Sequence, residues 1–392
     1  MNHPTSPSTR PPLWLASLAV AAAWGALYDI ARLVYLYVIF PIHEDVRIFY
    51  VAAEAGLRYG WSTIYDVPTL RALSASFPPP ETKIDSGATY IHPPLLAWLF
   101  VPLTALPEQT AYLVWSVLCL GALVWAWYMC APYQGIARFS LLLLALALWP
   151  VMECFYWGQP TIPLLALVVA AWWFAARDKA PAAAAALALA TALKPQAVIM
   201  VPLALLAAGR YRIFFGWAAG CTLLAAASAI NLGPSGLASY WHALKYVQAD
   251  TGHAYFTLAF LFGMSPLTYA LLLLQGLAAM VVARVRRAEL DVVFAVGLLG
   301  SLVTGFHLHQ PDYASLAVAG WLVLRTSPPL WHRLFLLAGV LTLQLLTTGA
   351  VVPQLVWDVA WLGILAFSNS AGSAASALAI RPAAVSAARV GT

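Results

Sequence analysis

The sequence predicts an all-α polytopic membrane protein with about twelve transmembrane helices and additional re-entrant or interfacial helices on its outer face. Of its 392 residues 62% are hydrophobic and only 9% are charged, and the mean hydropathy is +0.81. A soluble domain carries roughly 25% charged residues, so this chain cannot cover a water-facing surface. The 17 Trp and 17 Tyr residues suit a protein that is anchored at two membrane interfaces.

Twelve apolar runs are predicted to span the membrane, since a spanning helix needs about 20 residues or slightly fewer. The first run is too long for the apolar region of a signal peptide and lacks a clear cleavage site, so we interpret it as a retained span. The predicted spans are residues 13–39, 109–130, 138–154, 159–176, 180–193, 195–209, 212–232, 265–284, 290–305, 311–325, 333–351 and 353–372.

Basic residues set the orientation, because Lys and Arg accumulate in cytoplasmic loops. The twelve spans place thirteen Lys and Arg residues of the short loops and chain ends on the same side, and both termini are then cytoplasmic. These residues are Arg10, Arg138, Arg177, Lys179, Arg210, Arg212, Arg284, Arg286, Arg287, Arg325, Arg333, Arg381 and Arg389.

Two further apolar stretches, residues 92–106 and 253–263, cannot be counted as spans without moving some of these basic residues to the other side of the membrane. Both are short and start beside polar residues, so we interpret them as re-entrant or interfacial helices that line a buried cavity. The alternative is that 92–106 spans the membrane and two neighbouring spans merge.

The chain is predicted to form a single transmembrane domain over residues 1–372, with residues 41–91 as its first external loop and 373–392 as a cytoplasmic tail. The sequence pI of about 9.0 is explained by basic cytoplasmic loops and gives no reason to expect a nucleic-acid partner. The four cysteines stand singly, without metal-ligand spacing, so neither a zinc site nor a disulfide framework is expected.

The unusual polar residues gather on the outer face, beginning with "IHEDVRIFYVAAEAG" at 42–56. Glu44 and Asp45 can be explained as caps of an interfacial helix, where acids satisfy free N–H groups. Tyr50 can be explained as an interfacial aromatic residue. The alternative is that Asp45 stands at the start of this helix beside a cavity that the spans enclose, with Glu44 and Tyr50 as further substrate contacts.

His92, Gln159, Lys194 and Gln196 also fall on the outer face. In "YIHPPL" the prolines suit the first turn of a helix, whereas His92 can bind an anion or carry a proton. Lys194 can extend to the interface like any lysine. Its place in the sharp turn "LKPQ" favours a fixed cation that faces a cavity, for which a phosphate is the obvious partner.

His307, His309 and Asp312 form H-x-H-x-x-D. Spacing alone makes a metal site the weaker interpretation, and a group that holds phosphate or diphosphate is the stronger one. No acidic cluster of the DxD kind is present, so no metal or other cofactor is expected.

Four motifs in order, "D-x-x-x-F-Y-x-A-A-x-A-x-x-x-G" from Asp45, "Y-x-H-P-P-L", "G-Q" and "L-K-P-Q", resemble the family 87 glycosyltransferases of the GT-C superfamily. The resemblance runs from about Asp45 to Arg212 and more loosely to Asp312. Each motif alone is weak, and the four in sequence are fairly specific. The chain departs from the family pattern at "TGFHLHQPDY", which lacks a Ser-Pro start.

The resemblance implies an inverting transferase in the bacterial inner membrane, with a cavity open to the periplasm. It would move a hexose, most often mannose, from a polyprenyl-phosphate donor to a lipid or glycan acceptor. Asp45 would be the general base. His92, Gln159, Lys194 and one of His307 and His309 are then expected to hold the leaving phosphate, as developing charge requires fixed cations and donors.

Two other classes compete with this interpretation. A transporter or flippase of lipid-linked sugars would be expected to show internal repeats and polar residues near the midplane, and neither is evident. A surface-polysaccharide polymerase or ligase would be expected to have a long external loop late in the chain, which the predicted layout lacks.

Overall fold

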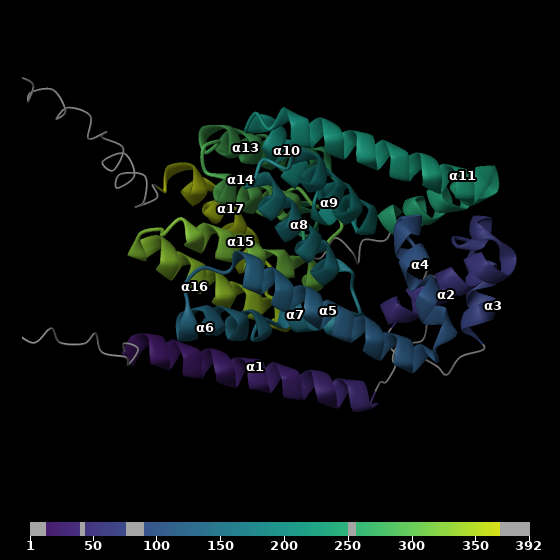
Figure 1. Ribbon diagram of the computed structural model, residues 1–392, viewed down its shortest axis with the longest axis horizontal. Helices are drawn as coiled ribbons and strands as arrows, with labels where there is room; N and C mark the ends of the chain where they lie inside the picture. The colour runs from purple at the N-terminus through teal and green to yellow at the C-terminus, as the bar shows by residue number, and fades with distance from the viewer. Residues whose placement is uncertain (1–12, 40–43, 76–89, 250–255, 369–392) are drawn as a thin grey trace, which may run out of the picture.

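The computed structural model describes residues 13–39, 44–75, 90–249 and 256–368, and within these ranges the chain is helical with no strands (Figure 1). In chain order the elements are α1 (Leu13–Ile39), α2 (Glu44–Tyr59), η1 (Trp61–Thr63), α3 (Val67–Ser74), α4 (Pro94–Phe100), η2 (Val101–Ala105), α5 (Glu108–Cys130), α6 (Gly135–Leu146), α7 (Trp149–Trp157), α8 (Thr161–Ala175), α9 (Ala180–Leu193), η3 (Pro195–Ala197), α10 (Met200–Ala207), α11 (Tyr211–Ala249), α12 (Leu258–Phe262), α13 (Pro266–Val285), α14 (Leu290–Val303), η5 (Gln310–Ala314), α15 (Ser315–Arg325), α16 (Leu330–Leu345), η6 (Leu346–Thr348) and α17 (Val352–Phe367).

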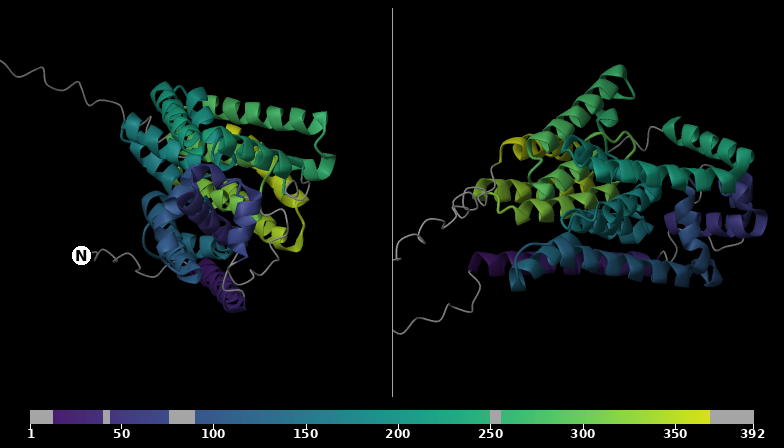
Figure 2. Two further views of the ribbon diagram at one scale, coloured as in Figure 1. Left: turned by 90° about the vertical axis from the view of Figure 1, so that its right-hand side faces the viewer. Right: turned by 45° about the horizontal axis from the view of Figure 1, so that its top comes forward.

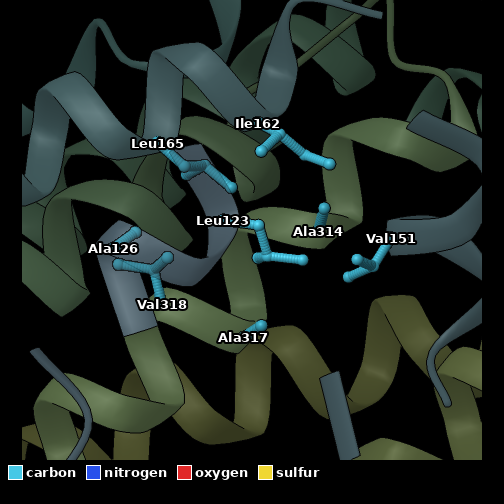
Figure 3. A pocket seen from close by; sticks show the side chains of 8 residues that line it. All are labelled: Leu123, Ala126, Val151, Ile162, Leu165, Ala314, Ala317 and Val318. Carbon is cyan, nitrogen blue, oxygen red and sulfur yellow. The ribbon is translucent and has the colours of Figure 1, made fainter. Parts of the chain in front are cut away.

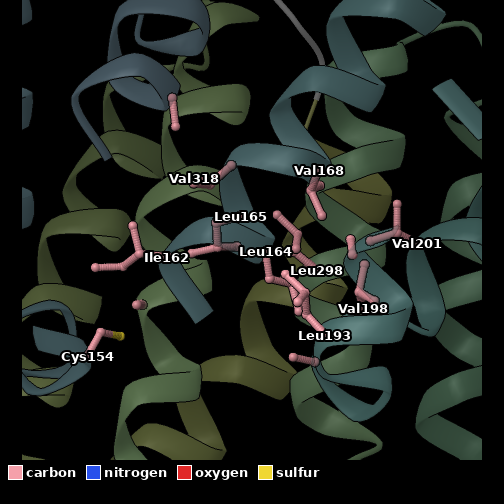
Figure 4. Packing of buried hydrophobic residues seen from close by; sticks show 14 of the residues in the cluster. Cys154, Ile162, Leu164, Leu165, Val168, Leu193, Val198, Val201, Leu298 and Val318 are labelled. Atoms are coloured by element: carbon pink, nitrogen blue, oxygen red, sulfur yellow. The ribbon is translucent and has the colours of Figure 1, made fainter. Parts of the chain in front are cut away.

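The core of the molecule lies around α8 and α14. Every residue of α14 from Val292 to Val303 is buried, as expected for a helix that is apolar on all sides. Side chains from α8, such as Leu164 and Val168, pack beside Leu193 at the end of α9 and Leu298 of α14 (Figure 4). These helices carry no charged residue in their middle, so apolar packing holds the centre of the core, and the indole of Trp172 in α8 donates to Asp291 at the start of α14 at 2.7 Å.

The helices around this core expose large apolar side chains, as expected for a surface that faces lipid. In α11, only 6% of the most apolar window is buried inside the molecule. Examples of exposed residues are Ile230 of α11 at 82% and Leu273 of α13 at 65%. The chain is therefore an integral membrane protein.

Helix lengths qualify the prediction of twelve spans. Each predicted span contains helix, but in the described residues only α1, α5, α11, α13 and the pair α16 and η6 are long and apolar enough to cross a membrane. The predicted span 138–154 is two helices, α6 and α7, bent by 58° and sufficient for a sixth span only if counted together. The shorter apolar helices are α8, α9, α14 and α17, together with α4 and η2.

The two ends of the bundle differ in composition. Helices α2, α3 and α4 form a cap at one end, and the later part of α11 reaches the same end (Figures 1 and 2). The start of α1 and the end of α17 lie at the opposite end (Figure 1). That end carries predicted cytoplasmic arginines of the described chain, such as Arg286, which donates to the carbonyl of Leu365, and Arg325, which lies 3.5 Å from Asp291.

The two apolar segments that were predicted to be re-entrant or interfacial, residues 92–106 and 253–263, contain short helices. Residues 94–105 form α4 and η2, and α4 packs against α2 in the cap. In the second segment α12 covers only Leu258–Phe262, and residues 253–255 lie outside the described ranges. A kink at Gly233, where φ is 62°, redirects α11 so that its later part packs on η1.

Candidate active site

A buried ion pair lies where α9 ends and α15 begins. The Lys194 ammonium nitrogen is 2.5 Å from Oδ1 of Asp312, and the two side chains are only 2% and 0% exposed. The second oxygen of Asp312 accepts a hydrogen bond of 2.9 Å from the backbone N–H of His309. Both oxygens of this carboxylate are thus engaged by the chain itself, so Asp312 is best understood as the fixed counter-ion of Lys194.

Gln159 connects this ion pair to Asp45. Its carbonyl oxygen accepts a hydrogen bond of 3.1 Å from Lys194, and its amide nitrogen donates to Oδ2 of Asp45. The result is a continuous series of polar side chains, Asp45, Gln159, Lys194 and Asp312, drawn from four separate segments. We refer to these four residues as the polar relay.

The turn after α7 fixes Gln159. Helix α7 ends at Gly158 in the left-handed conformation, with φ at 72°, and the N–H of Gln159 bonds back to the carbonyl of Cys154 at 2.9 Å. The indole N–H of Trp115 donates to the carbonyl of Gly158 at 2.8 Å. Both the C=O and the N–H of the peptide unit between Gly158 and Gln159 are therefore held before any substrate arrives.

A second ion pair fixes α2, the helix that carries Asp45. Arg47 makes a bidentate contact with Glu108 at the start of α5, with distances of 2.7 and 2.9 Å, and both residues are buried. Val46 packs on Gly158 so closely that a Cβ at that glycine would lie 2.0 Å from the valine methyl. The charged residues at the start of α2 therefore have different roles. Arg47 anchors the helix, and Asp45 is part of the polar relay.

His92 lies beside Lys194 as an uncharged imidazole. Its Nδ1 is 3.3 Å from the carbonyl oxygen of Leu193, which can only accept, so Nδ1 carries the proton. Burial, helped by the neighbouring Lys194 charge, lowers the pKa of His92 to about 3. The neutral ring therefore presents Nε2 as an acceptor, which suits a hydroxyl better than the phosphate predicted for it.

Two tyrosines hold the segment that carries His92. The Tyr65 hydroxyl donates to the carbonyl of His92 at 2.7 Å, and the Tyr90 hydroxyl donates to the carbonyl of Pro93 at 2.6 Å. Phe49 of α2 meets the imidazole edge-to-face, with ring centroids 5.0 Å apart. The aromatic residues of the cap thereby set the position of the histidine ring.

His307 and His309 lie together at the rim of this site, with ring centroids 5.0 Å apart. His307 is close enough to His92 for its charge to act on the His92 pKa. Among the residues that the structure describes, no group of three His, Cys, Asp or Glu side chains is arranged to hold a metal ion.

Three predicted residues stand apart from the polar relay. The Tyr50 hydroxyl donates to the carbonyls of Thr104 and Leu106, which makes it an anchor between α2 and η2. Gln196 lies in η3, and in the described chain no hydrogen bond joins it to Lys194 or Gln159. Glu44 is the first residue of α2, and its side chain lies outside what the structure describes.

The predictions overlooked one acidic residue of this region, Glu153 on α7. Its carboxylate accepts a hydrogen bond of 3.3 Å from Trp157, and Arg32 and Asp45 are the charged groups that act on it. The signal was visible in "ECFYWGQP", since an acid within an apolar run is costly and therefore a candidate for function.

A small cavity between α5, α7, α8 and α15 lies apart from these polar groups. All eight lining side chains are aliphatic, and none belongs to the polar relay (Figure 3). With no hydrogen-bonding group in its wall, this cavity is a packing defect of the core and no candidate for a sugar site.

Comparison with known proteins identifies the family of this chain. The model of glycosyltransferase family 87 matches residues 90–311, which include His92, Gln159, Lys194, His307 and His309. Asp45 precedes the matched region and Asp312 directly follows it. Searches of curated proteins and of solved structures each gave no match. Because the family model covers more than half of this chain of apolar helices, the chain belongs to glycosyltransferase family 87 and is a membrane glycosyltransferase.

Proposed function

We propose that this protein is an inverting transferase of the GT-C type that moves a hexose, with mannose as the first candidate, from a polyprenyl-phosphate donor. The acceptor is a lipid or glycan at the periplasmic side of a bacterial inner membrane. The observation that carries the proposal is the polar relay, which places a carboxylate and a buried ammonium on the two sides of one amide.

Asp45 is the proposed base. The acceptor hydroxyl oxygen attacks the anomeric carbon, its proton passes to the Asp45 carboxylate, and the bond between that carbon and the phosphate oxygen breaks. The electron pair of this bond leaves with the lipid phosphate. Proton removal by a positioned base contributes about 10²–10⁴-fold to a rate.

Lys194 is the proposed partner of the leaving phosphate. An ammonium group has three N–H donors; in the described chain one hydrogen bond goes to Gln159, and Asp312 balances the charge as the ion-pair partner. A further N–H donor can reach a phosphate oxygen while the ion pair stays intact. A donor that is fixed in place before the reaction stabilises developing charge without reorganisation, which makes this arrangement effective.

His92 completes the proposed donor site in a different way from the cation. Because its Nε2 accepts, it suits a hydroxyl of the donor sugar, which lies next to the phosphate in any sugar-phosphate lipid. His307 and His309 at the rim are proposed to contact the same donor.

The proposal is tested with purified protein in lipid nanodiscs, incubated with a panel of polyprenyl-phosphate hexoses and the host's own lipid extract. Mass spectrometry should reveal an acceptor that gains one hexose from one member of the panel. Movement of labelled donor between leaflets without any product would identify a flippase instead, and a chain-length ladder of products would identify a polymerase.

A further inference from the structure

Glu153 is an acidic residue inside the protein that forms no ion pair within the described chain. It sits in α7, four residues before Trp157 and six before Gln159, so its helix leads directly into the polar relay. Helix α7 also packs against α2, which carries Asp45. The carboxylate is therefore a neighbour of the proposed base, and Asp45 is one of the two charged groups that act on it.

The two oxygens of this carboxylate differ in their surroundings. Oε1 accepts the hydrogen bond from the Trp157 indole, which fixes the orientation of the group. Oε2 is buried and has no hydrogen-bond partner within the described chain. A buried acceptor without a partner destabilises the fold, and more so when it is charged.

The nearby cation does not fill this gap. The guanidinium group of Arg32 in α1 stacks over the Trp149 ring at 3.6 Å, and within the described ranges no hydrogen bond or ion pair joins it to Glu153. Arg32 thus acts on this region at a distance, and within the described residues Oε2 is left available to a bound group.

The hydrogen-bonding chemistry of the two carboxyl groups selects the class of that group. Glu153 and Asp45 offer no cation to a phosphate, and Lys194 lies on the other side of Gln159 from Asp45. A neutral sugar instead presents several hydroxyl donors on adjacent carbons, and carboxyl oxygens accept hydrogen bonds from hydroxyls. Because α7 packs against α2, a sugar bound at Asp45 lies next to the helix that carries Glu153.

We propose that Glu153 forms the acceptor subsite, where Oε2 accepts a hydrogen bond from a hydroxyl adjacent to the one that Asp45 deprotonates. This inference rests on the proposed function and adds the class of acceptor: an uncharged sugar with neighbouring hydroxyls, at the end of a glycolipid or glycan. The donor phosphate and the acceptor sugar then occupy opposite flanks of Asp45, the first beside Lys194 and the second beside Glu153.

The test compares binding of two kinds of probe to the full chain in nanodiscs by calorimetry. The acceptor probes are ethyl α-mannoside, ethyl β-glucoside and ethyl β-galactoside, and the probe of the donor flank is farnesyl phosphate. Glu153→Gln should weaken the best-bound glycoside by roughly tenfold, the loss of about one charge-assisted hydrogen bond, and leave farnesyl phosphate binding within about twofold. Glu289→Gln, which alters a carboxylate at the opposite end of the bundle, should change neither affinity.

Three results would overturn the subsite: no glycoside binding by the unaltered protein, equal glycoside binding by Glu153→Gln, or an equal loss for both probes. The Gln variant keeps the shape of the side chain and removes an unpaired charge, and size-exclusion profiles will verify that it folds. Glycoside binding that depends on Glu153, without transfer from any lipid-phosphate sugar, would contradict the proposed function and leave this subsite standing.

Discussion

His92 shows how burial sets the chemistry of a single side chain in this site. Its ring is packed against Phe49, its Nδ1–H is used by the carbonyl of Leu193, and the Lys194 charge is nearby. Burial and the Lys194 charge oppose a positive charge on the imidazole, and together they outweigh the hydrogen bond to Leu193, which favours it. The folded protein therefore holds His92 neutral over the whole physiological range.

A consequence for stability follows from the lowered pKa of His92. Below pH 6.5 the unfolded chain binds a proton at this residue that the folded chain refuses until about pH 3, so stability falls as the pH drops through this interval. His92→Asn keeps a donor for the Leu193 carbonyl and removes the titration. Melting temperatures between pH 8 and pH 5 should fall less steeply for His92→Asn than for the unaltered protein, and parallel curves would contradict the assignment.

The sequence motifs predicted Asp45, Gln159 and Lys194 as members of one site, and the structure brings these residues together. The pairing of Lys194 with Asp312 was not predictable, because these residues lie 118 positions apart and contacts across that distance leave no periodic signal. The same limit applies to Arg47 and Glu108, which are separated by 61 positions. The role of His92 as a neutral acceptor was also not predicted. Its tautomer depends on the Leu193 carbonyl, and only the fold brings that carbonyl to the ring.

Helices α2 and α7 meet at a single close contact, and the geometry of the site depends on it. Val46 follows Asp45 directly, and Gly158 precedes Gln159, so contact between Val46 and Gly158 sets the distance between the carboxylate and the amide. Only glycine has room here, because a methyl group would overlap the valine side chain.

Gly158→Ala should therefore lower both stability and transfer. A left-handed alanine costs roughly 1–2 kcal/mol, and overpacking adds about 1–3 kcal/mol. Gly135→Ala is the matched control, since Gly135 also has positive φ, at 56°, but open space around its Cβ position. Adding Val46→Ala to Gly158→Ala should restore part of the lost activity, and an equal effect of the two glycine variants in thermal melts would contradict the argument.

The apolar runs of the sequence predicted where helices occur, but they predicted the lengths of these helices less well. The prediction treated 138–154 as one span, whereas the chain bends between α6 and α7, where Pro150 opens the second helix. A proline in the first turn loses no hydrogen bond, so it favours a new helix start over continuation. The buried helices α8 and α14 are shorter than a span because protein, and not lipid, surrounds them.

The two ends of the bundle predict a fixed orientation in the membrane. Arginines gather at the end where α17 finishes, and the polar relay belongs to the end capped by α2, α3 and α4 (Figure 1). Basic residues favour the cytoplasmic side, so the polar relay should face outward.

Cysteine labelling in intact cells checks this orientation. In a background without the four native cysteines, Ala72→Cys on α3 should react with a maleimide that cannot cross the membrane. Asp178→Cys, in the turn between α8 and α9, should react only after the cells are permeabilised. Both positions are exposed, so accessibility within the fold does not distinguish them. The reverse labelling pattern would place the proposed chemistry on the cytoplasmic side.

The role of Asp45 is tested most directly by the rate at which Asp45→Asn transfers hexose from polyprenyl phosphate, measured beside its affinity for the donor. Asn can still accept from Gln159, so the fold and donor binding should persist, while transfer should fall by at least ~100-fold because the base is gone. Asp66→Asn is the control, since Asp66 caps α3 in the same cap of the molecule and Asn caps equally well. Full transfer by Asp45→Asn would contradict the account.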